Sequence, residues 1–149
     1  RVMTHAGEVK TLTGEELQFS YRYSALQCSQ DIVLEVTLRV NQGDKEAIRA
    51  KMEDFSQRRT SKQPLELPSA GSTFKRPDGY FVGALVEQSG LKGFRIGGAE
   101  ISRKHAGFIV NADHAKAEDV LQLIAYIQER IQKEYNVRLV PEVLVLGEV

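Results

Sequence analysis

The stretch PSAGSTFKRPDG, residues Pro68 to Gly79, is the part of the sequence around which the rest is organised. Two prolines bracket its centre, and Gly71 permits a backbone turn that residues with a Cβ resist. Ser72 follows that turn directly, with Lys75 and Arg76 close behind. The sequence therefore predicts a loop that presents one hydroxyl beside positive charge, which suits binding an anionic ligand and giving it a proton.

The composition is typical of a globular domain and limits the classes of partner. The 149 residues are 42% apolar and 27% charged, enough for one domain or for one domain plus part of another. Lys plus Arg and Asp plus Glu both number 20, so no overall field favours nucleic acid or an anionic membrane, and we expect neither as a partner. The single Cys28 and three scattered histidines have no disulfide or metal-ligand spacing.

The N-terminus and the length of the apolar runs indicate the subcellular location of the protein. No run approaches the ~18 apolar residues of a membrane span, and no signal-peptide core follows Arg1, so we expect a cytoplasmic protein. The chain opens on Arg1 without an initiator methionine. We expect a fragment whose upstream part is missing.

Two segments near the N-terminus alternate between apolar and polar residues, which predicts an antiparallel strand pair. They are Glu15–Ser24, with Leu17, Phe19, Tyr21 and Tyr23 on one face, and Asp31–Val40. Arg22 lies at the middle of the polar face of the first segment. An arginine there is more often part of a surface ion pair, although its planar guanidinium also matches a substrate carboxylate.

The remaining chain mixes helical and strand patterns and predicts an α+β fold, with a domain junction near Val40–Asp44. A helix is expected from Asp44 to about Arg59, with apolar Ala47, Ile48, Met52 and Phe55, and it is followed by the basic loop Thr60–Pro77. The next expected elements are a helix at Tyr80–Ser89 and strands around Gly93–Ile101 and Gly107–Asn111. The last are a long helix at Lys116–Tyr135, with an apolar stripe of Val120, Leu121, Ile124, Ile127 and Ile131, and a strand at Asn136–Leu146.

Ser72 is the first candidate for chemistry. A nucleophilic serine needs a nearby base, but the Gly-x-Ser-x-Gly elbow is absent and nothing places a histidine beside Ser72. A hydroxyl can instead act as a general acid toward a very basic site such as a carbanion, because its own pKa is high. The competing interpretation is a serine that only satisfies the loop backbone.

Glu142 and a basic cluster are the other candidates. In the expected C-terminal strand Glu142 shares a face with Val140, Leu144 and Leu146, and such an apolar environment would raise its pKa and keep it protonated. Pro141 cannot donate to a sheet ladder, so an edge position that turns Glu142 to water is equally open. The cluster of Lys62, Lys75 and Arg76 suits phosphates, or else is a solvated loop. No nucleotide-cofactor motif such as Gly-x-Gly-x-x-Gly is present.

Seven segments, in order along nearly the whole chain, carry a resemblance to a known family. They are Phe19–Ser24, Arg59–Leu65, Pro68–Pro77, Gly90–Gly93, Ile96–Ala99, Lys104–Asn111 and Pro141–Val143. Together they closely resemble the UDP-N-acetylenolpyruvoylglucosamine reductases, bacterial flavoenzymes of peptidoglycan-precursor synthesis, but only their C-terminal half. The short linker after Ser72 and the arginine at position 76 resemble the branch that lacks an inserted tyrosine loop.

The resemblance implies a reaction in two halves, with roles for several residues. NADPH reduces FAD, which then passes a hydride to UDP-N-acetylglucosamine enolpyruvate to give UDP-N-acetylmuramate for cell-wall biogenesis, cell shape and cell division. Ser72 matches the serine that protonates the resulting carbanion, while Glu142 and Arg22 match residues that stabilise the enol and the substrate carboxylate. Substrate-binding roles fall on Lys62 and Arg76 with neighbouring Lys75, and Arg59 is expected near the flavin ring.

The resemblance also implies a division of the chain. Residues 1–42 would be the last strands of an incomplete FAD-binding domain, and residues 43–149 the substrate-binding domain. FAD would be bound mainly by the missing N-terminal half, so this chain alone should be inactive. The alternatives are a non-catalytic module that binds a nucleotide sugar or another anion, and a serine hydrolase, which the missing elbow disfavours.

Overall fold

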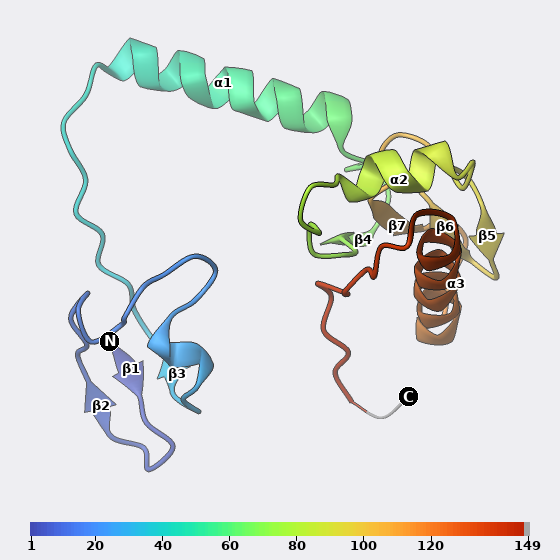
Figure 1. Cartoon of the computed structure of the whole chain (residues 1–149). Coiled ribbons are helices and arrows are strands. Elements are labelled where there is room, and N and C mark those ends of the chain that lie inside the picture. Colours follow the sequence, from blue (N-terminus) through green and yellow to red (C-terminus); the bar gives the residue numbers. More distant parts are fainter. Residues whose placement is uncertain (148–149) are drawn as a thin grey trace. The chain divides into compact units, whose positions relative to one another are not determined.

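The computed structural model describes residues 1–147 and has the predicted α+β class, with three α-helices and two antiparallel sheets among the described residues (Figure 1). It divides into two compact units, one spanning Arg1–Asp44 and the other beginning at Lys45. None of the helices among the described residues is long and apolar enough to cross a membrane.

The first unit contains a small antiparallel sheet in the order β2-β1-β3. Its strands are β1 (Val2–Met3), β2 (Val9–Lys10) and β3 (Ile32–Val33), and a short 3-10 helix, η1 (Ala25–Gln27), precedes β3. Val2 pairs with a residue on each neighbouring strand and is 3% exposed, whereas the apolar side chains of β3 are about half exposed. The unit therefore has little core of its own.

The predicted strands at Glu15–Ser24 and Asp31–Val40 are wrong, apart from the two residues of β3. Gln18 and Arg22 have φ values of 47° and 57°, in the left-handed region that interrupts an extended strand. Ser20 and Tyr23 instead exchange backbone hydrogen bonds of 3.1 Å across a tight turn. The alternation fails because no described layer covers the apolar face: Phe19 is 70% and Tyr21 90% exposed.

The second unit is built on a four-stranded antiparallel sheet in the order β4-β7-β6-β5. Its strands are β4 (Ser69–Ser72), β5 (Arg95–Ile96), β6 (Ala99–Ile101) and β7 (Phe108–Asn111). Strands were predicted near β5, β6 and β7, but β4 lies inside the segment predicted as a loop. The pairing of β4 with β7 is irregular between Ser69 and Ser72, where Gly71 has a φ of 84°. The turn expected at Gly71 is therefore a distortion within a strand.

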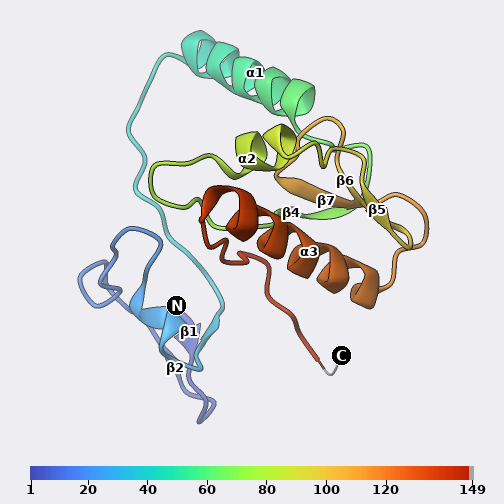
Figure 2. The same ribbon diagram turned by 45° about the vertical axis from the view of Figure 1, so that its right-hand side comes forward.

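Three helices accompany this sheet: α1 (Lys45–Lys62), α2 (Val82–Gln88) and α3 (Ala117–Tyr135). Figure 2 shows α3 lying along the sheet, where it contacts β5, β6 and also α2. The apolar stripe of α3 is confirmed at Ile124, Ile127 and Ile131, which are buried with Leu123. Helix α1 forms as predicted, but Ile48, Met52 and Phe55 on it are 48–66% exposed, so its expected apolar stripe is not buried.

Asp119 fixes the start of α3 against the β5–β6 turn. Its Oδ2 accepts the backbone N–H groups of Lys116 at 2.9 Å and Gly98 at 3.1 Å. These two bonds lower the pKa of Asp119, because they favour the charged carboxylate. Gly97 adopts a φ of 53°, and a Cβ there would overlap the Asp119 carboxyl group. The turn therefore requires glycine at this position.

The predicted strand at Asn136–Leu146 is also wrong. Only Pro141 bridges to the sheet, opposite Phe74, between hydrogen bonds from Lys75 N–H to Val140 O (2.8 Å) and from Glu142 N–H to Thr73 O (2.9 Å). Pro141 has no N–H with which to extend the ladder. The segment beyond it leaves Leu144 and Leu146 87% and 88% exposed.

Candidate functional site around Ser72

Ser72 ends β4, and its side chain belongs to an alternating set. Ser72, Phe74 and Arg76 line one pocket, as expected for every second residue of an extended segment. Between them, buried Thr73 turns away, and its Oγ1 accepts the backbone N–H of Ile109 on β7 at 3.2 Å. The hydroxyl of Ser72 is exposed and makes no hydrogen bond to the described residues.

The cavity beside Ser72, called here the Ser72 pocket, has a volume of about 390 Å³. Its other walls are the start of α2 and the β6–β7 connection, Lys104–Gly107. Arg76 and Lys104 bring two cations to this pocket, and Glu87 on α2 brings a carboxylate. The Glu87 carboxylate is held by Lys92 Nζ at 2.5 Å. The pocket therefore combines an unengaged hydroxyl with local positive charge in a chain whose charges balance overall.

Arg76 contacts the two residues that precede α2. Its Nε donates to the backbone oxygen of Tyr80 at 3.3 Å, and its Cζ lies 3.9 Å from the centre of the Phe81 ring. A cation at this distance is attracted by the face of an aromatic ring. The guanidinium is thus oriented although the side chain is exposed.

Lys104 and His105 were not predicted as site residues, although both line the Ser72 pocket. Lys104 Nζ donates to Thr60 O at 2.8 Å, near the end of α1, and to Glu66 Oε2 at 3.3 Å. The pKa of Glu66 is lowered first by its own backbone N–H and then by Lys104. Only the pairing of β7 with β4 brings the β6–β7 connection beside Ser72, so no local sequence pattern marks these residues.

His105 is seated among glycines. Its Nδ1 accepts the backbone N–H of Gly107 at 3.1 Å, so the neutral ring carries its proton on Nε2. A Cβ at Gly83 or Gly107 would lie 3.3 or 3.1 Å from His105 Cε1, which shows how closely the ring packs on both backbones. The edge of the ring meets Phe108 at a centroid distance of 4.9 Å. His105 is therefore a fixed ring with Nε2 as its remaining donor.

Glu142 lies on the segment beside β4 but does not line the Ser72 pocket. Its backbone is bonded to Thr73, the residue next to Ser72, and its side chain is half-buried. The apolar surroundings expected for it are not formed, since Val140 is 48% exposed and Leu144 and Leu146 are almost fully exposed.

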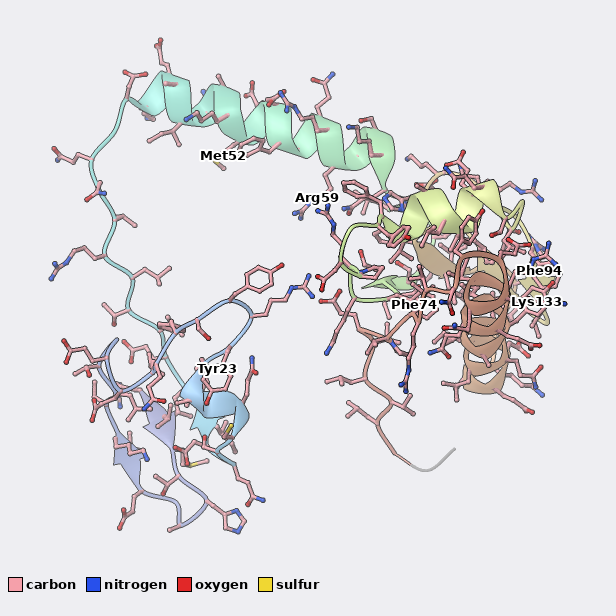
Figure 3. The ribbon with its side chains drawn as sticks, in the orientation of Figure 1. Tyr23, Met52, Arg59, Phe74, Phe94 and Lys133 are labelled. Atoms are coloured by element: carbon pink, nitrogen blue, oxygen red, sulfur yellow. The ribbon has the colours of Figure 1, made fainter. Side chains whose placement is uncertain are left out.

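Of the other predicted site residues, three belong to the second unit and one belongs to the first. Arg59 projects from the last turn of α1 (Figure 3), and Lys62 is the last residue of that helix; both are exposed, as is Lys75. None of these three lines the Ser72 pocket. Arg22 belongs to the first unit, in the tight turn after Ser20, where its Cζ is 5.8 Å from the Tyr21 ring centre.

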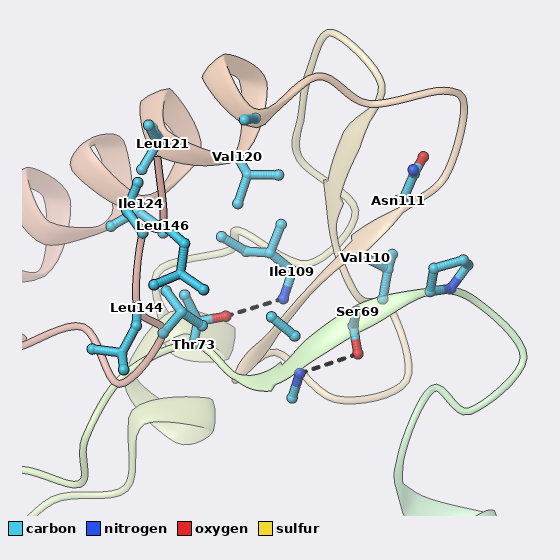
Figure 4. Close-up of a pocket in the computed structure, with 16 residues that line it drawn as sticks. Ser69, Thr73, Ile109, Val110, Asn111, Val120, Leu121, Ile124, Leu144 and Leu146 are labelled. Atoms are coloured by element: carbon cyan, nitrogen blue, oxygen red, sulfur yellow. Dashed lines mark hydrogen bonds between the residues drawn. The ribbon is translucent and has the colours of Figure 1, made fainter. Parts of the chain in front are cut away.

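A second pocket, of about 620 Å³, lies on the face of β4 toward which Thr73 turns. Figure 4 shows its apolar wall, with Ile109 and Val120, Leu121 and Ile124 of α3, and Leu144 and Leu146 of the C-terminal segment. No lysine, arginine or histidine lines it. The polar groups suited to an anion therefore lie on the Ser72 side, and no group of three metal-ligating side chains occurs among the described residues.

Comparisons with known proteins point to one family. The sequence model of the UDP-N-acetylenolpyruvoylglucosamine reductase C-terminal domain matches residues 63–146. The reductases of Limosilactobacillus fermentum and Lactiplantibacillus plantarum are 51% and 50% identical to this chain over 98% and 99% of its length. The chain spans about half of each relative, 49% in both cases.

A solved structure agrees with the sequence relatives. The crystal structure of UDP-N-acetylenolpyruvylglucosamine reductase from Thermus caldophilus matches with a TM-score of 0.74 and 38% identity. The match covers 93% of this chain and 49% of that one.

Proposed function

This chain belongs to the UDP-N-acetylenolpyruvoylglucosamine reductase family, and from that premise we propose that it is the substrate-binding half of such a reductase. The reaction is the NADPH-dependent, FAD-mediated reduction of UDP-N-acetylglucosamine enolpyruvate to UDP-N-acetylmuramate, a step of peptidoglycan synthesis. We expect it in the cytoplasm, where NADPH and nucleotide sugars are available. The observation that carries the proposal is that Ser72 and Arg76 share one pocket.

In this proposal the Ser72 pocket binds the anionic substrate. The substrate carries a diphosphate and a carboxylate, and the pocket offers the guanidinium of Arg76, the ammonium group of Lys104 and the Nε2 donor of His105. We also assign Lys62 and Lys75 to the substrate, although neither lines the pocket. Their charges attract the phosphates, and the forked donors of Arg76 suit phosphate oxygens.

Ser72 is the proton donor of the second half-reaction. Addition of a hydride to the terminal carbon of the enolpyruvyl double bond moves the electron pair to the carbon beside the carboxylate. The O–H bond of Ser72 then breaks and its proton forms the new C–H bond; solvent returns a proton to the Ser72 oxygen. A hydroxyl can serve because the receiving carbon is very basic, and a hydroxyl without a hydrogen-bond partner among the described residues can turn toward it.

Glu142 and Arg22 have electrostatic roles in this proposal. Between hydride addition and protonation, negative charge spreads over the carboxylate and the enol oxygens, and oriented donors stabilise such charge. The bond from Glu142 N–H to Thr73 O anchors the backbone of Glu142 to the residue that follows Ser72. We assign Arg22, from the first unit, to the substrate carboxylate.

In this proposal the chain contributes one side chain to the binding of FAD. The sequence contains no Gly-x-Gly-x-x-Gly turn to hold a dinucleotide diphosphate, and exposed Arg59 is the side chain that we assign to the flavin ring. We therefore propose that FAD is held mainly by an N-terminal half like that of the relatives, with residues 1–42 as the last part of it and residues 43–149 as the substrate domain. FAD, when bound, supplies the hydride that it has received from NADPH.

The full-length gene product that contains these residues provides the test. We expect flavin absorption in the purified protein, and oxidation of NADPH that depends on added UDP-N-acetylglucosamine enolpyruvate. The 149-residue chain alone should show neither. A full-length product that binds UDP but carries no flavin and oxidises no NADPH would support the alternative, a non-catalytic nucleotide-sugar-binding module.

A further inference from the structure

Phe81 stands at the start of α2, lines the Ser72 pocket and is 64% exposed. Single exposed apolar side chains are common on protein surfaces, so this exposure alone carries no argument. What distinguishes Phe81 is the contact that its ring makes. The Cζ of Arg76 lies 3.9 Å from the ring centre, well inside the ~6 Å range of cation–π attraction.

Arg76 is held at two points, and both come from the residues just before α2. The backbone oxygen of Tyr80 accepts Nε at 3.3 Å, and the Phe81 ring supports the guanidinium group. No further hydrogen bond of Arg76 to the described residues is present, so its two terminal nitrogens remain available. Glu87, the nearby pocket carboxylate, is engaged by Lys92.

We propose that Phe81 is a positioning residue for Arg76, whose ring and adjacent carbonyl orient the guanidinium before an anionic substrate arrives. An exposed arginine normally loses much side-chain freedom when it binds a ligand, and this loss weakens binding. Stacking on Phe81 removes part of that freedom in the free protein. The inference rests on the proposed function, in which Arg76 binds the substrate diphosphate.

The test measures the affinity of the full-length gene product for UDP by calorimetry, together with KM and kcat in the reductase assay. Phe81→Leu keeps an apolar side chain but removes the π face, and we expect UDP affinity to fall roughly three- to tenfold. KM should rise by a similar factor while kcat changes less than about twofold. Phe81→Tyr, which keeps the ring, should restore the wild-type values.

A double-mutant cycle separates positioning from direct ligand contact. In an Arg76→Met background, Phe81→Leu should have no further effect on UDP affinity, because the ring then has no guanidinium to orient. Phe55→Leu on α1 is the matched control: Phe55 is 63% exposed, outside the pocket, and its replacement should leave affinity unchanged.

The outcomes distinguish a failure of the Phe81 positioning role from a failure of the proposed substrate site. If Phe81→Leu weakens UDP binding equally with and without Arg76, the ring contacts the ligand itself and the positioning role is wrong, although the substrate site stands. The role is also wrong if Phe81→Leu leaves UDP affinity at the wild-type value. If Arg76→Met alone does not change UDP affinity, the assignment of Arg76 to the substrate fails, and the role of Phe81 fails with it.

Discussion

Replacing Ser72 with alanine should separate the two half-reactions of the proposed reductase. The substitution removes one hydroxyl at the end of β4 and leaves the backbone pairing with Phe108 unchanged. Because that hydroxyl is exposed and makes no hydrogen bond to the described residues, the free energy of unfolding should change by less than about 0.5 kcal/mol. Any large loss of activity would then report chemistry rather than folding.

The expected loss follows from the proposed role of Ser72 as a general acid. Removal of a positioned proton donor slows its step by about 10²- to 10⁴-fold, which corresponds to about 2.7–5.4 kcal/mol in the barrier. Only the step that protonates the substrate carbon uses this donor. The reduction of flavin by NADPH should therefore stay within about twofold of the wild-type rate.

Stopped-flow absorbance of the full-length gene product measures both half-reactions. Flavin bleaching after mixing with NADPH gives the first rate, and recovery of absorbance after mixing the reduced protein with UDP-N-acetylglucosamine enolpyruvate gives the second. Ser69→Ala is the matched control, because Ser69 lies on the same strand but lines the apolar pocket. Within the described part of the chain its Oγ makes one hydrogen bond, accepting the N–H of Gly71 at 3.4 Å. Equal losses in both half-reactions of Ser72→Ala, or normal reoxidation, would refute the donor role.

Three further predictions concern residues that support the site. Glu142→Gln should slow flavin reoxidation by about 10²-fold and leave reduction intact, since only the charged intermediate depends on the carboxyl group; wild-type reoxidation would remove Glu142 from the mechanism. Thr73→Val deprives the buried N–H of Ile109 of its acceptor, so urea titration should show a loss of about 1–3 kcal/mol that Thr73→Ser avoids; equal stability of both variants would contradict this. Because backbone N–H groups lower the pKa of Asp119 in the folded state, its contribution to stability is complete above the unfolded pKa of ~3.9 and is lost as the pH falls through the folded value. Urea midpoints between pH 7 and 3 should therefore fall less steeply in Asp119→Asn, and an identical slope would exclude the linkage.

The long helix α3 and the wrongly predicted strand at Glu15–Ser24 show what a covering surface adds to a sequence pattern. Helix α3 was predicted because its apolar stripe recurs at helical spacing, and the sheet and α2 are there to cover it. The alternation at Glu15–Ser24 is equally clear, but Phe19 and Tyr21 have no described layer to pack against, and the backbone turns at Gln18 and Arg22 instead. At Glu15–Ser24 the alternating pattern alone did not predict a strand correctly, because no described surface covers its apolar face.

The residues of the Ser72 pocket also differ in whether a local sequence pattern marks them. Ser72 and Arg76 could be found from one short stretch, because glycine, proline and the nearby cations act locally. Lys104 and His105 enter the pocket through the pairing of β7 with β4, which joins residues far apart in the sequence. Local pattern carries no information on such pairing, so Lys104 and His105 were not predicted as site residues.

The extended backbone of β4 and of the residues after it explains why Ser72 and Arg76 share a pocket. Residues 72 and 76 lie on one face only while the backbone between them is extended, since side chains alternate along such a chain. Hydrogen bonds on both sides keep this backbone extended. Toward β7, Thr73 N–H donates to Gly107 O at 2.9 Å and Thr73 Oγ1 accepts Ile109 N–H. Toward the C-terminal segment, Lys75 N–H donates to Val140 O and Thr73 O accepts Glu142 N–H. The geometry of a four-residue interval therefore depends on β7 and on the C-terminal segment.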